Sequence, residues 1–300
     1  MFGGFDVITL RGRDIRMPEP CVLAVGKFES IHLGHRALIG EVVRLAKDNG
    51  LASALIVFEP HPYRVLSDSG YKPLFTGPER ARLVEGLGVD YMVEHHFDAD
   101  FAALSGCFFG QKLINELQAR IVVVGKGYRF GRGREGTVDT LRLFADVVEV
   151  GVNETSTSAI RGLLSENKLT EAEGLLGFPF FIIGDVTPGQ RLGRTIGFPT
   201  INLYPCEEKY LPVDGVYATR VVIDNKKYRG VTNIGVRPTV ADKGAPRSVE
   251  TYLLDFEGGE LYGKDIRVEF LSFIRLERRF DSLEALQVQI AKDCKKVAEL

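Results

Sequence analysis

Two histidines three residues apart, His32 and His35, stand where an apolar run gives way to a helical pattern. The run at residues 22–25 predicts a buried strand, and Gly26 begins the turn that follows it. In an open α/β sheet, the carboxyl end of a strand meets the free N–H groups at the start of the next helix, and this place binds anions. The pattern therefore predicts a phosphate site at the two histidines.

Two more segments bring polar side chains to the predicted carboxyl ends of strands. His61 follows the apolar run 54–58 in a loop that two prolines hold extended, and Arg129 and Arg132 lie in a glycine-rich loop after the run 121–125. Parallel strands end at one edge of a sheet, so we expect these groups to converge on the histidines and to bind a polyphosphate. For the arginine loop alone, a solvated glycine-rich turn is an equal alternative.

Hydroxyl groups precede a later helical pattern. Ser156 and Thr157 stand just before apolar residues at helical spacing, and N-capping is the more common role of such residues. Arg161 is expected in the first helical turn, where the helix dipole disfavours a cation. This placement indicates an arginine that is held for an anionic ligand.

The second half of the chain carries oxygen ligands and a carboxylate. Thr200 and Asn202 are two residues apart and point to the same side of an extended chain, and their hydroxyl and amide oxygens suit Mg²⁺. A solvated strand face is the alternative, and it is the more common one. Glu250 interrupts an apolar strand and would suit a base that accepts the proton of an alcohol, unless it also lies on a solvated face.

The elements that position these residues divide the chain in two. Up to residue 177, buried runs alternate with helical patterns, which predicts an α/β domain with a parallel sheet. From there on, strands follow one another without helices, which predicts a small antiparallel barrel or sandwich. We expect one domain at residues 1–177 and a second at 178–300. The expected strands are 22–25, 54–58, 91–93, 121–125 and 147–150, then 181–186, 216–223, 228–234, 249–255 and 267–274.

Helices are expected between the strands of the first domain, among them one that ends at Asn49 and Gly50 and one that begins at residues 76–79 and ends at Gly88, and another is expected near residue 300. Apolar spacing predicts helix over most of residues 97–117. A final helix is expected after a cap at Asp281 or Ser282. Its apolar stripe is expected to comprise Leu283, Leu286, Ile290 and Cys294.

Composition limits the class of partner. The 300 residues carry a formal net charge of −2, which gives no electrostatic footprint for nucleic acid or an anionic membrane, so small-molecule partners are expected. The four cysteines are scattered, without the pairs of a zinc site or a disulfide framework. With no signal-like N-terminus and no apolar run of about 18 residues, a cytoplasmic location is expected. Weak self-association stays open.

Eight motifs between residues 22 and 296 resemble, in order, those of the bacterial bifunctional riboflavin kinase/FMN adenylyltransferases, also called prokaryotic FAD synthetases. They are HLGH (32–35), PHP (60–62), YRFG (128–131), STSAIR (156–161), GFPTIN (197–202), NIGVRPT (233–239), VETY (249–252) and FIR (273–275). The resemblance implies an N-terminal Rossmann-like nucleotidyltransferase domain and a C-terminal flavokinase β-barrel.

The same resemblance implies two reactions. Riboflavin would take the γ-phosphate of ATP to give FMN, and FMN would attack the α-phosphate of a second ATP to give FAD and pyrophosphate, with Mg²⁺ as the metal. Two alternatives remain: a riboflavin kinase whose first domain is a non-catalytic nucleotide-binding lobe, and a flavin-binding protein that catalyses neither step.

Roles carried over from the family fall on matching positions. The catalytic residues are Glu250, His32 and His35, and the metal ligands are Thr200 and Asn202. The nucleotide- and phosphate-binding residues are Gly26, Phe28, Gly34, Ser156, Thr157, Arg161, Gly193 and Thr195. The flavin-binding residues are His61, Gly127, Arg129, Asn202 and Arg275.

The first domain departs from the family pattern at three positions. Glu29 replaces an Asp and moves the carboxylate outward by a methylene, and Ser30 replaces a Gly. If the backbone there needs a positive φ, a serine would cost about 1 kcal/mol. Gly127 stands where relatives carry Asp or Asn, so we expect one polar contact to the ligand to be missing.

Overall fold

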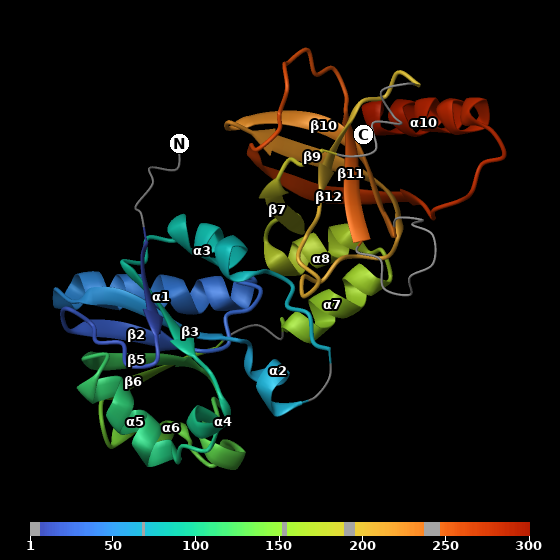
Figure 1. The fold of residues 1–300 in the computed structure, drawn as a ribbon. Helices are drawn as coiled ribbons and strands as arrows, with labels where there is room; N and C mark the ends of the chain where they lie inside the picture. Colours follow the sequence, from blue (N-terminus) through green and yellow to red (C-terminus); the bar gives the residue numbers. More distant parts are fainter. Residues whose placement is uncertain (1–6, 68–69, 152–154, 189–195, 237–246) are drawn as a thin grey trace. The chain divides into compact units, whose positions relative to one another are not determined.

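The structure, a computed structural model, describes residues 7–67, 70–151, 155–188, 196–236 and 247–300. The chain divides into two compact units, Met1–Thr157 and Ser158–Leu300 (Figure 1). The expected functional boundary after Gly177 rests on the change of sequence pattern and stays a prediction. Among the described residues, no helix combines the length and the apolar character needed to cross a lipid bilayer.

A parallel sheet forms the centre of the first unit. Six strands of the described residues run in the order β1-β4-β3-β2-β5-β6, and each neighbouring pair is parallel. They are β1 (Ile8–Gly12), β2 (Cys21–Val25), β3 (Ala52–Glu59), β4 (Tyr91–His96), β5 (Ala119–Gly125) and β6 (Asp146–Val150). Because β2 lies between β3 and β5, the loops that follow these three strands share one edge of the sheet.

Helices cover both faces of this sheet (Figure 1). The described helices of this unit are α1 (Leu33–Asn49), α2 (Pro62–Leu66), α3 (Gly77–Glu85), α4 (Ala99–Ala102), α5 (Gly106–Asn115), the 3-10 helix η1 (Arg132–Arg134) and α6 (Val138–Arg142). α1 buries Leu38 and Val42 on one face and ends where Gly50 adopts a left-handed φ of 64°. α5 and α6 pack on the other face, in an apolar cluster that includes Phe109 and Leu141.

Three local expectations for this unit are corrected by the structure. β1 is an additional edge strand, which its mixed burial pattern conceals in the sequence. The single helix expected over residues 97–117 is two, because Asp98 caps α4 and Ser105 caps α5. The loop after β3 is not extended throughout, since Pro62 begins the short helix α2.

A curled antiparallel sheet forms the second unit. Six strands of the described residues run in the order β7-β12-β9-β10-β11-β8, each antiparallel to its neighbours. They are β7 (Phe181–Asp185), β8 (Thr200–Leu203), β9 (Gly215–Ile223), β10 (Lys226–Val236), β11 (Arg247–Leu253) and β12 (Asp265–Arg275). A bridge between Thr187 and Asn202 brings the two edges of the sheet together. The expected fold class, α/β followed by a small antiparallel barrel, is confirmed.

In the part of this unit that the structure describes, three helices accompany the sheet: α7 (Thr157–Ser165), α8 (Leu169–Leu176) and α10 (Leu283–Ala298). Ser282 caps α10, as expected, by accepting a hydrogen bond from the Ala285 N–H at 3.1 Å. Val297 packs in an apolar cluster with Val216 and Val231 of the sheet. The assignment of Leu283 to the apolar stripe was wrong, because its side chain is 48% exposed. The covered face of α10 begins one turn later.

Candidate functional site

The two histidines close the loop between β2 and α1. His32 is the N-cap of α1, and its Nδ1 accepts a hydrogen bond from the His35 N–H at 3.2 Å. The two rings stack, with centroids 3.8 Å apart and an interplanar angle of 13°. Both side chains therefore lie at the start of α1, where free backbone N–H groups favour an anion.

Both imidazoles are neutral at pH 7. Burial lowers the pKa of His32 to about 4, and burial together with the neighbouring His32 lowers the pKa of His35 to about 3. Within the described part of the chain, the Nδ1 atom of His35 is buried without a hydrogen-bond partner. A neutral imidazole has one N–H donor and one acceptor, so these residues suit a phosphate as hydrogen-bond donors and not as cations.

Glu29 is a buried carboxylate that joins the β2–α1 loop to another segment. It is 3% exposed, and it accepts hydrogen bonds from the Leu74 N–H at 2.8 Å and from the hydroxyl of Tyr71. Its Oε2 also lies 3.6 Å from the Nε2 of His61. His61 itself is 2% exposed and caps α2 by accepting from the Tyr63 N–H. The carboxylate of Glu29 therefore contacts groups inside the protein through both of its oxygen atoms.

The backbone strain of this loop does not fall on Ser30. The positive φ values belong to Phe28, at 41°, and Ile31, at 45°, so the serine carries no left-handed penalty. Its Oγ lies 2.9 Å from the Oγ1 of Thr157, at hydrogen-bond distance. Close packing explains Gly26, because a Cβ there would lie 3.0 Å from the Phe28 ring.

The glycine-rich loop after β5 folds back on itself. Phe130 is buried against Phe109 and forms a bridge with Gly136. Arg129, next to it, is exposed. Gly127 has a φ of 73°, in the left-handed region. Gly adopts this conformation readily, and Asn and Asp adopt it more often than other residues do. The backbone conformation is therefore compatible both with the glycine and with the Asp or Asn of the family pattern. Whether the glycine costs a ligand contact stays a prediction.

Arg161 lies in the second unit and past the first turn of its helix. α7 begins at Thr157, four residues earlier, so the placement expected from the sequence was wrong and the dipole argument does not apply. The guanidinium lies 4.9 Å from the centroid of the Tyr210 ring, and the Tyr210 hydroxyl donates to the Arg161 carbonyl at 3.4 Å. Its role in nucleotide binding stays a prediction, as does that of Ser156, which directly precedes α7.

One row of paired residues crosses five strands of the second unit. The antiparallel register pairs Asn202 with Glu250, Glu250 with Asn233, Asn233 with Val216, and Val216 with Arg275. Residues paired across antiparallel strands project from the same face, so the predicted metal ligand, base and flavin-binding arginine share one side of the sheet. Residues from five separate strands meet in this row.

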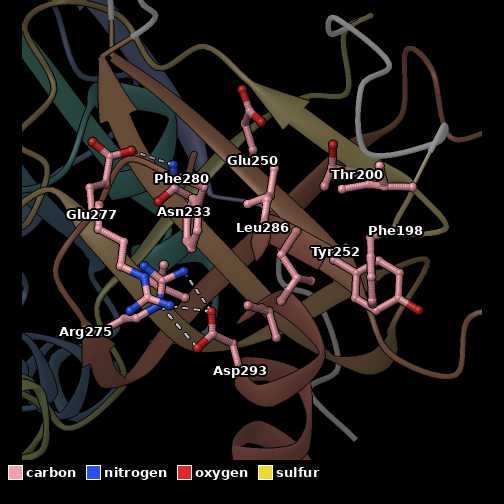
Figure 2. A pocket seen from close by; sticks show the side chains of 15 residues that line it. Phe198, Thr200, Asn233, Glu250, Tyr252, Arg275, Glu277, Phe280, Leu286 and Asp293 are labelled. Carbon is pink, nitrogen blue, oxygen red and sulfur yellow. Dashed lines mark hydrogen bonds and ion pairs between the residues drawn. The ribbon is translucent and has the colours of Figure 1, made fainter. Parts of the chain in front are cut away.

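Most of this row lines a cavity of about 260 Å³ (Figure 2). Thr200 and Glu250 lie on one side of it, and their polar groups point the same way, away from Arg275. The lining also includes aromatic and apolar side chains that suit a flat ring system: Phe198, Tyr252, Phe280, Leu286 and Ile290. Asn202 is next to Glu250 in the register but is only 5% exposed.

Arg275 is bound to α10 at the opposite side of the cavity. Its Nε and Nη2 donate to Asp293 Oδ2 at 3.0 and 2.8 Å, and its Nη1 donates to the Leu276 carbonyl at 3.0 Å. Nearby, the Asn233 amide donates to Glu277 at 2.8 Å. Arg275 thus lines the predicted flavin site, while its donors hold the last helix against the sheet.

Sequence reasoning missed Asp293, although a signal was present. Asp293 stands among the inward-facing residues of an amphipathic helix, one residue before Cys294 in the expected stripe, and is 3% exposed. An acidic residue on the buried face of a helix indicates a cationic partner. Two predicted nucleotide-binding residues, Gly193 and Thr195, lie outside the described residues. Within the described part of the chain, no group of three His, Cys, Asp or Glu side chains could hold a metal.

Two family models match the chain. The model described as FAD synthetase matches residues 14–164, and the one described as riboflavin kinase matches residues 176–300. A bifunctional riboflavin kinase/FMN adenylyltransferase of Escherichia coli (strain K12) is 40% identical over 290 residues, which cover 92% of this chain and 91% of the relative. Its namesake from Bacillus subtilis (strain 168) is 36% identical over 284 residues, 91% of this chain and 90% of the relative.

A solved structure shares the fold over nearly the whole chain. It is a crystal structure described as a macrolide-efflux protein from Streptococcus pneumoniae, with a TM-score of 0.86 and 29% sequence identity. The match covers 98% of this chain and 100% of that one.

Proposed function

The chain belongs to the bifunctional riboflavin kinase/FMN adenylyltransferase family, and on this premise we propose that it phosphorylates riboflavin with ATP and then adenylylates the resulting FMN with a second ATP. The products are FAD and pyrophosphate. The observation that supports this most is that the Glu250 carboxylate and Thr200 line one side of a cavity that aromatic and apolar side chains also line.

For the kinase step, Glu250 is the proposed general base. The ribityl hydroxyl of riboflavin is a weak nucleophile at pH 7, and a carboxylate that accepts its proton assists attack on the γ-phosphorus of ATP. The apolar walls formed by Phe198, Tyr252 and Phe280 would hold the flavin ring, which directs the ribityl chain towards Glu250. The bond from the γ-phosphorus to ADP breaks as the new phosphoester forms.

Thr200 and Asn202 would hold Mg²⁺ in this step. Their side chains supply a hydroxyl oxygen and an amide oxygen, the hard donors that this ion prefers. The Asn202 Nδ2 donates to the Thr200 carbonyl at 3.4 Å, so the amide nitrogen is used within β8 and the amide oxygen is the atom suited to a cation. The bound ion would neutralise charge on the phosphates of ATP.

The adenylylation step makes a different demand. The phosphate of FMN is already an anion, so no base is required, and the protein must instead position two polyanions in line. His32 and His35 would donate hydrogen bonds to ATP phosphates at the start of α1, and Arg129 would supply positive charge from the loop after β5. Pyrophosphate leaves as the phosphate of FMN bonds to the α-phosphorus.

The test is flavin turnover by the purified protein. Riboflavin, ATP and Mg²⁺ are incubated with it, and the flavins are separated by chromatography. FAD formation is the expected result. FMN alone would favour a kinase whose first domain does not turn over, and retention of unchanged riboflavin would favour a flavin-binding protein; either outcome contradicts the proposal.

The variant Glu250→Gln assigns the two steps to separate sites. We expect FMN formation to fall by a factor of about 10² to 10⁴, the range for loss of a general base, while added FMN is still converted to FAD. Loss of both steps in a folded variant would contradict two independent sites. The domain division at residue 177, the cytoplasmic location, the absence of nucleic-acid partners and any weak self-association remain predictions.

A further inference from the structure

A buried arginine is paired with a carboxylate at the carboxyl end of β3. Arg80 of α3 is 1% exposed, and its Nη2 donates to Glu59 Oε2 at 2.7 Å. Glu59 is the last residue of β3, and its backbone carbonyl accepts a hydrogen bond from the Phe97 N–H at 3.0 Å. The Glu59 side chain is 42% exposed. The pair therefore joins a buried cation to a carboxylate at the edge of the sheet where the predicted phosphate-binding loops begin.

The position of Arg80 is unfavourable for a cation. A guanidinium is rarely buried unless it is paired. Arg80 is the fourth residue of α3, and helical side chains lean towards the N-terminus, where the helix dipole disfavours positive charge. Its Nε is buried without a hydrogen-bond partner among the residues that the structure describes. An apolar side chain would fill this place without these penalties, so the positive charge indicates a role beyond packing.

Glu59 supplies the reason for that charge. His61 follows it by two residues, and β3 pairs with β2, whose loop carries His32 and His35. Neighbouring strands are about 4.8 Å apart, so a carboxylate at the end of β3 lies near the place where the phosphates of ATP are proposed to bind. Without a cationic partner, this carboxylate would repel the phosphates. Arg80 neutralises its charge from inside the protein.

The other carboxylates beside Arg80 have donors of their own. Glu94 of β4 and the Arg80 guanidinium both lie close to Gly77, but Glu94 accepts a hydrogen bond from Arg11 at 3.3 Å. Glu79, which precedes Arg80, accepts from the Thr76 N–H at 2.7 Å in the capping box of α3. The carboxylate that the short hydrogen bond assigns to Arg80 is therefore that of Glu59.

We propose that Arg80 is a charge-compensating residue for the adenylylation step: it acts through Glu59, cancels the negative charge at the end of β3, and so allows the phosphates of ATP to bind at the adjoining loop. This inference rests on the proposed FMN adenylyltransferase activity. Arg80 is buried, so it is a positioning residue and does not contact the nucleotide itself. The effect is electrostatic, and salt therefore screens it.

The variants Arg80→Met and Glu59→Gln change the local charge in opposite directions. They are compared in FAD synthesis from added FMN at an ionic strength of about 0.15 M. Arg80→Met leaves Glu59 unpaired, and the KM for ATP should rise about threefold to tenfold, the order that Coulomb's law gives for one added charge near an anion at a partly solvated site. Glu59→Gln keeps a hydrogen-bond acceptor without the charge, so the KM should fall by a similar factor. The double variant should return to the wild-type KM.

Salt separates the effect of charge from an effect of packing. Raising the ionic strength to about 1 M shortens the Debye length from about 8 Å to about 3 Å. The KM values of Arg80→Met and Glu59→Gln should then converge on that of the wild type at the same salt concentration. A difference in KM that stays constant with salt would overturn the proposal, because a lost packing contact does not depend on screening.

Arg44→Met is the matched control. It also removes an arginine that is paired with carboxylates, since Arg44 donates to Glu41 and to Asp48 at 2.6 Å each, and it gives the same change in net charge. Arg44 stands about 18 Å along α1 from His32, beyond the Debye length of about 8 Å. We expect an unchanged KM for ATP. A rise equal to that in Arg80→Met would show that net charge, and not the charge at the end of β3, is responsible.

The outcomes separate the two proposals. A wild type that forms FAD from FMN, together with an unchanged KM for ATP in Arg80→Met, overturns the role of Arg80 alone. If Arg80→Met does not fold, Glu59→Gln decides: a fall of the KM supports the role, and a rise or no change overturns it. A wild type that forms no FAD from FMN overturns the proposed activity and this inference with it.

Discussion

The ion pair between Arg275 and Asp293 joins α10 to the sheet beside the cavity of the second unit, and its removal gives a sharp test of the proposed flavin site. The side chains are 21% and 4% exposed, and the arginine donates to Asp293 Oδ2 through two nitrogens. Arg275→Met keeps much of the side-chain volume but leaves the aspartate buried without this partner. We expect a destabilised second unit and weaker riboflavin binding.

The size of the effect follows from burial. Breaking a buried ion pair by removing one member costs about 3–5 kcal/mol. The lower end applies here, because Arg275 is partly exposed and the Gln289 amide still donates to Asp293 Oδ1 at 2.7 Å. A loss of about 3 kcal/mol lowers the melting temperature of a unit of this size by roughly 6–12 °C. Thermal unfolding followed by circular dichroism measures it.

The double variant Arg275→Met/Asp293→Leu distinguishes an effect through α10 from direct flavin contact. Replacing both members of a buried pair by apolar side chains is often neutral or stabilising, so the melting temperature should return to the wild-type value. Riboflavin affinity, measured by quenching of flavin fluorescence, should return with it. Restored stability with riboflavin binding still lost would refute the reasoning and place Arg275 directly on the flavin.

Arg229→Met is the matched control for this experiment. Arg229 also binds α10, by donating to the Ala298 carbonyl at 2.7 Å, but its side chain is 50% exposed. Exposed contacts of this kind contribute at most about 1 kcal/mol. If Arg229→Met lowers the melting temperature as much as Arg275→Met does, burial of the ion pair does not explain the destabilisation.

Three further perturbations test other parts of the chain. Burial lowers the pKa of His32 from 6.5 to about 4, so the unfolded chain binds more protons between these values and stability falls as the pH drops from 6.5 towards 4. His32→Asn keeps an N-cap acceptor and should flatten this dependence in thermal unfolding; an unchanged slope would contradict it. The shorter side chain of Glu29→Asp cannot reach both Tyr71 and Leu74, so the free energy of unfolding should fall by about 1–3 kcal/mol. An unchanged midpoint of urea unfolding would contradict this prediction. Thr200→Val should raise the Mg²⁺ concentration needed for half-maximal FMN formation, whereas Thr200→Ser, which keeps a hydroxyl, should behave like the wild type. If the two variants depend on Mg²⁺ equally, Thr200 is not a metal ligand.

Much of the fold could be predicted from the sequence because its elements have strong local patterns. The apolar run expected at residues 54–58 became β3, and the cap expected at Ser282 begins α10. β1 could not be found in this way, because an edge strand with few buried side chains has little pattern. The break between α4 and α5 was missed because two capping residues outweigh the apolar spacing that continues across them.

The sequence predicted which residue types form the candidate sites, but it predicted only some of the contacts between those residues. The topology of a parallel sheet was enough to expect His32 and His61 at one edge, because parallel strands end together. It could not reveal that Glu29 contacts Tyr71, since that contact depends on how a loop packs. The same limit applies to Ser30, whose expected strain was absent and whose partner Thr157 is far away in the chain.

The sequence by itself determined most of the elements, the two-part organisation and the family, because each depends on neighbouring residues or on motifs read in order. Only the tertiary structure decided which residues meet. The register of the antiparallel strands places Asn202, Glu250 and Arg275 in one row. The guanidinium of Arg275 donates hydrogen bonds to Asp293 and so holds α10 against the sheet. Register and long-range contact arise from the packing of the whole sheet, which no local pattern contains.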